Sequence, residues 1–257
     1  MKKIFGIALT FLSFFYFFSS LCFAGTLGEP KTVGENKFRV GIDYQYIFDK
    51  DLEYKSGAKS TDLISGTEIK DLRRTFAKFS YGIMNNLEVY GLLGVAEGGV
   101  KLDSFDTDPG GSLYKCDFDV DSDFAYGAGL KLSYNYDENW VLGLDVHYIR
   151  HKNDYSGTIT GGGATNTSTG DTTFQEWQVM PSVGYKISKF TPYLGFGYTD
   201  MRLKVETRGS NTTKYEADDN VGVVCGIAYE PYENLSLGVE GRYVDETAMS
   251  VMGAYKF

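Results

Sequence analysis

The sequence predicts an all-β protein. The expected fold is a transmembrane, antiparallel, up-and-down β-barrel of about ten strands, or about eight in the alternative count, with short periplasmic turns and long extracellular loops. Three observations predict this architecture. Apolar and polar residues alternate at a period of two, short and long connections follow one another in turn, and aromatic residues gather at both ends of the strands.

Residues 1–24 are expected to be a signal peptide. Lys2 and Lys3 form a basic start, an apolar run follows over 4–21, and Cys22 and Ala24 place small residues where a signal peptidase reads them. The alternative is an uncleaved anchor, because a run of this length just spans a bilayer. The predicted organisation is therefore a signal peptide over 1–24, a short N-terminal lead over 25–36 and one outer-membrane barrel domain over 37–257.

The composition suits one exported all-β domain. The 257 residues are enough for a single barrel, and 20 Tyr, 18 Phe and 31 Gly against 5 Pro favour strands and turns over a helical bundle. The net charge is −9 at pH 7. Nucleic acid binding requires a basic face, so this acidic balance argues against a nucleic acid partner.

Alternation marks the strands. Successive side chains of a strand point to opposite faces, so a period of two separates an apolar face from a polar one. Three segments carry a strand-like composition with less regular alternation, over 74–83, 87–96 and 192–205. The clear cases are the segments 38–48, 124–136, 140–148, 177–187, 221–229, 235–243 and 249–257.

The connections between these segments are of two kinds. Four tight polar turns each follow a strand that ends in tyrosine, at Tyr81, Tyr134, Tyr185 and Tyr229. Long polar connections rich in Gly, Asp, Ser and Thr lie between them, over 49–69, 97–122, 152–173 and 206–219. A soluble sandwich has no reason to sort its connections in this way. A transmembrane barrel places short turns on the periplasmic side and long loops outside.

Aromatic residues form two groups along the strands. Those beside the short turns are Tyr81, Tyr134, Tyr136, Trp140, Tyr185, Tyr229 and Tyr255. Those toward the long connections are Tyr46, Phe48, Tyr126, Tyr148, Trp177 and Tyr198. Two aromatic belts around an aliphatic middle are what the two interfaces of a membrane favour.

The C-terminal segment from Val251 to Phe257 alternates and ends in Phe, with Tyr255 two residues earlier. This ending resembles the assembly signal of bacterial outer-membrane barrels, and residues 37–257 are similar to the small outer-membrane protein A-like and opacity-like barrel families. The resemblance implies the outer membrane of a Gram-negative bacterium. Its implied partners are the barrel-assembly machinery, outer-membrane lipid and lipopolysaccharide, and Tyr255 and Phe257 would be the assembly signal. Those families usually have fewer strands than the ten counted here.

The inward positions of the strands carry nearly matched charges. A small barrel has a crowded lumen in which unpaired charge is costly. We therefore expect a network of paired charges that plugs the lumen, with a narrow polar path as the alternative. The expected members are Arg39, Asp43, Arg74, Lys78, Glu88, Lys131, Asp145, His147, Glu176, Lys186, Glu240 and Arg242.

An acidic run precedes one of the clear strands. Asp117, Asp119, Asp121 and Asp123 alternate with apolar residues and serine, so the pattern predicts that all four share the lumen side of a strand that begins above the membrane. A solvated acidic rim is the expected interpretation. A Ca²⁺ site is the alternative, although Ser122 or Asp123 stands where a calcium loop needs Gly.

Asp145 and His147 form the sharpest catalytic candidate, because a carboxylate beside a histidine can orient it as a general base. The pair resembles the Asp-x-His dyad of the omptin proteases, and Asp119 and Asp121 would be the opposing aspartates. The pair departs from that family because it lies on the fifth expected strand and deep in the membrane band. We therefore expect His147 to belong to the charge network.

The leading expectation is a non-enzymatic outer-membrane barrel with an envelope-structural or surface-interaction role through its extracellular loops. The first alternative is a narrow, porin-like channel for ions or small polar solutes. An omptin-like protease or a lipid-modifying enzyme comes third. Neither a cofactor nor a resident metal is expected, since the sequence has no phosphate-binding Gly-rich loop and no zinc-spaced cysteines. The extracellular ligand is unknown.

Overall fold

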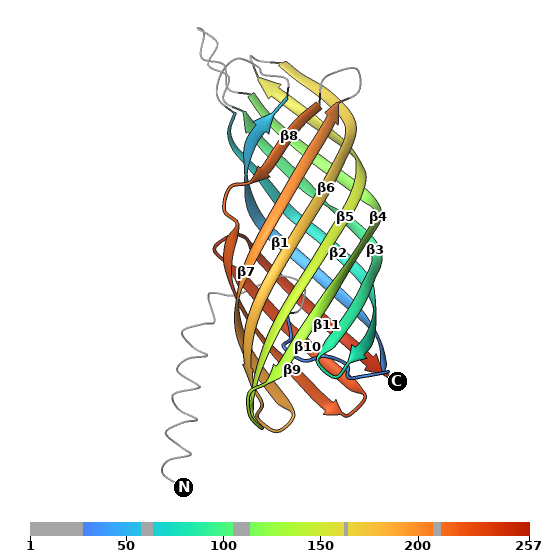
Figure 1. The fold of residues 1–257 in the computed structure, drawn as a ribbon. Helices are drawn as coiled ribbons and strands as arrows, with labels where there is room; N and C mark the ends of the chain where they lie inside the picture. The colour runs from blue at the N-terminus through green and yellow to red at the C-terminus, as the bar shows by residue number, and fades with distance from the viewer. Residues whose placement is uncertain (1–27, 58–63, 105–113, 162–163, 208–211) are drawn as a thin grey trace.

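The computed structural model describes residues 28–57, 64–104, 114–161, 164–207 and 212–257. The predicted signal peptide lies outside these residues. The predicted fold class is confirmed, because the chain forms one sheet of 11 antiparallel strands that closes on itself (Figure 1). Among the described residues, no helix is long and apolar enough to cross a membrane.

The strands follow one another around the barrel. In chain order they are β1 (Phe38–Ser56), β2 (Ile64–Met84), β3 (Leu87–Ser104), β4 (Tyr114–Asn135), β5 (Trp140–Gly161), β6 (Ala164–Tyr185), β7 (Phe190–Thr207), β8 (Thr212–Ala217), β9 (Val221–Tyr232), β10 (Leu235–Tyr243) and β11 (Thr247–Lys256). We call the end with the tight turns the turn end and the opposite end the loop end.

The barrel has a different strand number at its two ends. Toward the turn end, β9, β10 and β11 fill the wall between β7 and β1, so that with β1–β7 the wall has ten strands. Toward the loop end, the short strand β8 alone bridges β7 and β1, which makes eight. The break between β8 and β9 is held by backbone hydrogen bonds, from Asp218 N to Asp51 O (3.2 Å) and from Thr199 N to Asn220 O (2.8 Å).

The strands extend further than the alternation predicts. Most of the residues expected in the long connections are strand, and β5 and β6 each span 22 residues. The alternation does not reveal these extensions, because the apolar residues change from the outer to the inner face toward the loop end. There the outward side chains are polar and the inward ones are apolar, such as Leu52, Val100 and Tyr155. Apolar residues therefore mark the outer face in one half of the wall and the inner face in the other.

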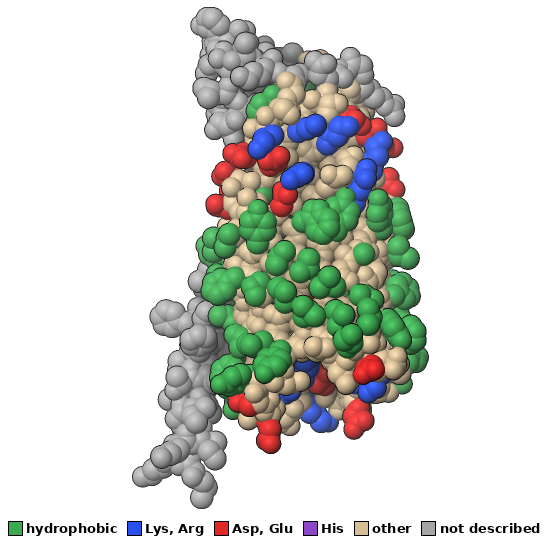
Figure 2. All heavy atoms as spheres, viewed as in Figure 1, with side chains coloured by type: hydrophobic (Ala, Val, Ile, Leu, Met, Phe, Trp, Pro, Cys, Tyr) green, Lys and Arg blue, Asp and Glu red, His purple; other side chains and the backbone are tan. Residues whose placement is uncertain are grey.

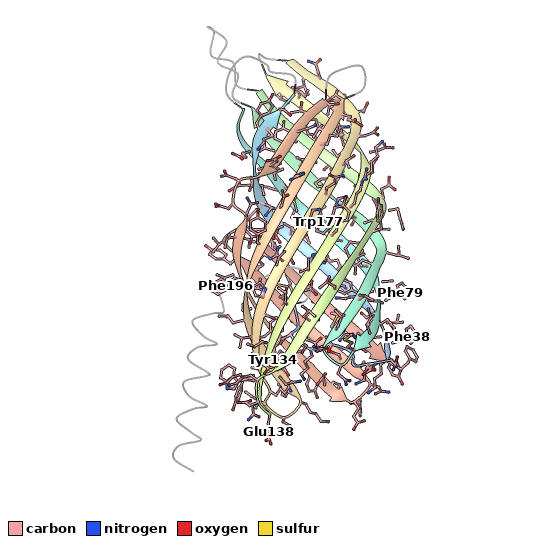
Figure 3. The ribbon with its side chains drawn as sticks, in the orientation of Figure 1. Phe38, Phe79, Tyr134, Glu138, Trp177 and Phe196 are labelled. Carbon is pink, nitrogen blue, oxygen red and sulfur yellow. The ribbon has the colours of Figure 1, made fainter. Side chains whose placement is uncertain are left out.

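An apolar band surrounds the ten-stranded part. Figure 2 shows it as a broad green zone with charged side chains above and below it. Phe79, Trp177 and Phe196 point outward within it (Figure 3), and 53% of Trp177 is exposed. On β6, the outward residues from Trp177 to Tyr185 are all apolar, a length that matches the roughly 9–11 residues of a transmembrane strand. Exposed aromatic residues lie at both ends of the band, among them Tyr134 and Trp140 toward the turn end and Phe124 and Trp177 toward the loop end.

Candidate functional site in the barrel lumen

The lumen of the ten-stranded part is lined with buried polar side chains. Alternation places them there, because most of them follow an outward apolar residue on their strand, as Asp43 follows Ile42 and Lys131 follows Leu130. The structure buries all but one of the residues expected in the charge network. The buried members are Arg39, Asp43, Arg74, Lys78, Glu88, Lys131, Asp145, His147, Glu176, Glu240 and Arg242.

Lys186 differs from the prediction. β6 ends at Tyr185, and Lys186 lies in the following turn, where Nζ donates to Asn135 Oδ1 (2.6 Å) at an exposed position. Alternation places a side chain on a given face only while the strand continues, so the inward assignment fails one residue beyond the strand end.

Asp145 and His147 form an enclosed cluster on β5. His147 Nδ1 and the hydroxyl of Tyr90 both hydrogen-bond to Asp145 Oδ1, at 2.9 and 2.7 Å. Lys131 Nζ lies 3.9 Å from Asp145 Oδ2, and Lys78 Nζ lies 3.7 Å from the centroid of the Tyr90 ring. Only 1% of His147 is exposed. The carboxylate therefore has three partners in the wall, and the histidine is shielded from bulk solvent.

Glycine makes room for the tyrosine of this cluster. A Cβ on Gly129 would lie 2.5 Å from the Tyr90 hydroxyl. The same arrangement recurs at Gly226, where a Cβ would lie 2.4 Å from the hydroxyl of Tyr193, which donates to Glu240 Oε2 (2.8 Å). Neither tyrosine was singled out from the sequence. Both stand at inward positions of their strands, so the alternation itself contained the signal.

A second cluster lies where the wall changes from ten strands to eight. Arg242 Nη1 donates to Glu246 Oε1 (2.9 Å) and to Thr199 Oγ1 (3.0 Å). Lys50 Nζ lies 3.7 Å from Asp245 Oδ2 and 3.6 Å from Glu246 Oε2. Asp245 and Glu246 belong to the β10–β11 turn, which folds its carboxylates inward, and neither residue stands out in the sequence.

Arg74 and Glu176 meet across the lumen. Arg74 Nη1 donates to Glu176 Oε2 (2.8 Å), although the two residues are 102 positions apart. Glu240 and Arg242, adjacent in the expected network, hydrogen-bond to different partners. The pairing within the network is thus set by the closure of the barrel and not by proximity along one strand.

The N-terminal lead enters the lumen from the turn end. Gly28 N donates to Glu240 Oε2 (2.5 Å), and Val33 N donates to Glu88 Oε2 (2.8 Å). Glu88 also forms a two-pronged pair with Arg39, at 2.8 and 2.9 Å. We call residues 28–33 the N-terminal plug. The sequence predicts no role for this lead, because its hydrogen bonds to Glu88 and Glu240 join segments that are far apart in the chain.

Pro30 of the plug packs closely against glycine residues of the wall. A Cβ on Gly143 would lie 2.5 Å from Pro30 Cα, and a Cβ on Gly184 would lie 2.8 Å from Pro30 Cγ. Ser182 Oγ donates to Gly28 O (3.1 Å). Beside the plug, a recess of about 30 Å³ is lined by residues that include Glu29, Arg39 and Glu230, which is room for roughly one water molecule.

Apolar side chains fill the lumen of the eight-stranded part. They form one contiguous core that replaces the charge network toward the loop end. Its members are Ile47, Leu52, Ile69, Leu72, Val100, Phe118, Val120, Tyr155, Phe174, Met201, Leu203, Val205, Tyr215, Ala217 and Ala248. From the plug upward, the interior thus passes through buried charged side chains, of which Asp43 and Lys78 form no ion pair among the described residues, to an apolar core.

The acidic run lies outside the lumen, which corrects its predicted position. Asp117, Asp119, Asp121 and Asp123 are exposed, whereas Phe118 and Val120 are buried. An irregularity between Val120 and Ala125 shifts the register of β4 against β5 and changes the parity of the strand. In the described part of the chain, no three His, Cys, Asp or Glu side chains are placed to hold a metal ion.

The outer face of the eight-stranded part carries exposed ion pairs. Lys55 Nζ lies 2.8 Å from Glu216 Oε2 between β1 and β8, and this hydrogen bond lowers the pKa of Glu216 and raises the pKa of Lys55. Lys152 and Asp171 form a similar pair (2.9 Å) between β5 and β6, which raises the pKa of Lys152. Such exposed pairs contribute little to stability.

Residues 110–256 match the family described as outer membrane protein beta-barrel domain. A search of curated proteins finds no match.

Several solved structures of outer-membrane proteins are similar to this chain. The outer membrane protease OmpT from Escherichia coli aligns with a TM-score of 0.56 at 12% identity, covering 91% of this chain and 99% of that chain. The toluene transporter TodX from Pseudomonas putida gives a TM-score of 0.38 at 12% identity, covering 86% of this chain and 88% of that chain. The attachment invasion locus protein Ail of Yersinia pestis gives a TM-score of 0.31 at 13% identity, covering 87% of this chain and 99% of that chain. At these identities the likeness concerns the fold alone.

Proposed function

Because the chain belongs to the outer membrane protein beta-barrel domain family, we propose that it is a closed, non-enzymatic barrel that serves the envelope structurally or through its extracellular surface. The protein lies in the bacterial outer membrane, so the turn end faces the periplasm and the loop end faces the outside. The proposal concerns what the barrel does there.

The observation that carries the proposal is the filling of the lumen. The N-terminal plug occupies the periplasmic mouth, buried charged and polar side chains occupy the membrane level, and an apolar core occupies the extracellular part. A conducting path needs continuous polar space, and an apolar core of interlocking side chains disfavours ions. This packing argues against the channel alternative.

The burial of Asp145 and His147 argues against the enzyme alternative. A general base must come within hydrogen-bond reach of its substrate, directly or through one water. Asp145 already accepts hydrogen bonds from two side chains, and His147 is nearly inaccessible. Asp119 and Asp121 face outward, on the other side of the wall. The four residues therefore do not face a common cleft.

Planar-bilayer recording tests the sealed lumen. Purified protein whose folding is verified by its mobility on semi-native gels is expected to give no single-channel steps, while a known porin inserted in the same way conducts. Regular conductance steps from the wild type would favour the channel instead.

A deletion strain tests the envelope role. We expect loss of the protein to increase sensitivity to detergent or to change cell adhesion. A variant with residues 58–63 and 105–113 replaced by short Gly-Ser turns separates these roles, because a structural role needs only the barrel. It should restore detergent resistance if the role is structural. It should fail to restore adhesion if the role depends on the extracellular surface. A deletion strain identical to the parent in both assays would contradict the proposal.

A further inference from the structure

Two rows of cationic side chains cross β5, β6 and β7 on the outer face of the barrel. The strand register aligns Arg150 with Gln175 and Gln175 with Arg202. Two residues further toward the loop end, the register aligns Lys152, Thr173 and Lys204 in the same way. All six are outward positions. Each row therefore has a cation on either side of a neutral hydrogen-bonding side chain.

The spacing of the rows suits phosphate groups. Neighbouring strands lie about 4.8 Å apart, so the two cations of a row stand roughly 10 Å apart with a neutral donor between them. The rows are separated by two residues, or about 7 Å. A phosphate above the central strand would be within reach of both flanking side chains. Guanidinium and ammonium groups are the side chains that bind phosphate oxygens most strongly.

The rows lie at the level of lipid headgroups. Tyr148 and Trp177 form the next outward row toward the membrane, with ring centroids 4.9 Å apart. Aromatic pairs of this kind mark the membrane interface. Figure 2 shows basic side chains gathered just above the apolar band on this face, and Figure 3 places Trp177 within it.

Acidic side chains flank the rows on both sides. Arg202 pairs with Asp200 (2.8 Å) on the membrane side, and toward the loop end Lys152 pairs with Asp171 (2.9 Å) and Lys204 pairs with Glu206. Within the described chain Arg150 has no ion pair, and the side chain of Arg202 is 59% exposed. Exposed ion pairs of this kind are weak because water screens both charges, so a phosphate can replace them.

We propose that these rows bind the phosphate groups of a phosphorylated glycolipid in the outer leaflet, such as the diphosphorylated lipid A part of lipopolysaccharide. The lipid would place its phosphates over Gln175 and Thr173 and its acyl chains against the apolar surface around Trp177. The inference needs only the outer-membrane location of the barrel, and it is independent of the sealed lumen.

Binding of purified diphosphoryl lipid A to the protein in detergent tests the inference. The site variant is R202Q/K204Q, which removes one Arg and one Lys from β7. The control is R73Q/K101Q, which removes one exposed Arg and one exposed Lys from β2 and β3, each also near an acid, at 3.8 and 4.0 Å. The two variants change the net charge equally, so only the position differs.

We expect the site variant to bind diphosphoryl lipid A at least about tenfold more weakly than the wild type, and the control to bind within about twofold. R150Q/K152Q on β5 should repeat the loss. The wild type should bind dephosphorylated lipid A as weakly as the site variant binds the diphosphoryl form. The inference would be overturned if the site and control variants lost affinity equally, or if the wild type bound phosphorylated and dephosphorylated lipid A equally well. Semi-native gels verify that each variant is folded.

Discussion

His147 donates a ring N–H to Asp145, which also accepts a hydrogen bond from Tyr90. In a lumen of low dielectric, hydrogen bonds to a carboxylate are strong, and here both reach Oδ1 while Lys131 Nζ lies 3.9 Å from Oδ2. Removing one donor leaves the others in place. The cluster therefore has the properties of a structural element, in which each member fixes the orientation of its neighbours.

Changing His147 to Gln should leave the barrel folded. Glutamine keeps similar volume and an N–H donor for Asp145, so the expected loss of unfolding free energy is at most about 1–2 kcal/mol. Neither wild type nor variant should cleave peptide pools or modify lipopolysaccharide in folded detergent preparations. An activity of the wild type that falls about a hundredfold or more in the variant would identify a catalytic base and contradict our proposal.

Changing Arg242 to Ala should weaken the barrel strongly. The substitution leaves Glu246 and Asp245 buried with only Lys50 to offset them, and stranding a buried charge costs about 3–5 kcal/mol. Arg202→Ala is the matched control, since it breaks an exposed pair with an expected effect of about 0–1 kcal/mol. Urea unfolding followed on semi-native gels measures both. Equal midpoints for the two variants would mean that the Arg242 cluster is hydrated.

At the scale of elements, the N-terminal plug and the β10–β11 hairpin close the lumen from different places. The plug satisfies carboxylates at the periplasmic mouth with backbone N–H groups. The hairpin ends within the wall and turns two carboxylates inward. Its turn includes Val244 with φ of 95°, a conformation that β-branched residues rarely adopt. The buried ion pairs on the next two residues hold this turn in place.

Deleting residues 28–33 should destabilise the barrel without preventing its insertion. Glu240 and Glu88 each lose a backbone donor, and each unsatisfied charged group costs about 1–3 kcal/mol or more. Residues 25–27 are kept so that processing is unaffected. Thr32→Ala is the control, because it removes only an exposed hydrogen bond to Asn85 O (2.6 Å). An unfolding midpoint equal to that of the wild type would mean that the plug does not stabilise the barrel.

At the scale of the whole molecule, the barrel has two stacked parts built from the same strands. The ten-stranded part is apolar outside and polar inside, and the eight-stranded part is polar outside and apolar inside. Each arrangement suits its surroundings, because lipid contacts the first part and water the second. The reduction from ten strands to eight narrows the barrel in the part that faces water, where the lumen needs a packed core.

Removing Phe257 should impair assembly more than export. Phe257 N donates to Phe38 O (2.8 Å), and its ring packs on Tyr255 with centroids 5.0 Å apart, so it joins the last strand to the first. Cell fractionation should then find processed chains, starting at Gly25, that accumulate outside the heat-modifiable outer-membrane pool. Phe190→Ala, which removes another aromatic residue at the periplasmic end, is the control. If the Phe257 deletion and the control assemble equally well, Phe257 has no special role in assembly.

Much of the fold could be read from local patterns. Alternation placed Arg39, Glu88 and Asp145 inward. When one face of a strand contacts lipid, its polar residues must lie on the other face, which lines the lumen. The alternating turns and loops predicted the barrel and its direction in the membrane. These features depend on neighbouring residues and on the solvent outside each face, so the sequence by itself determined them.

Tertiary structure alone decided the partners within the lumen and the ends of the strands. Arg74 pairs with Glu176, and Gly28 meets Glu240, only because the sheet closes and the plug folds back into it. The outward position of Asp119 depends on an irregularity in β4 and on the point where the wall leaves the membrane. Beyond that point lipid no longer requires an apolar outer face, and the alternation of a strand does not reveal which of its faces is buried.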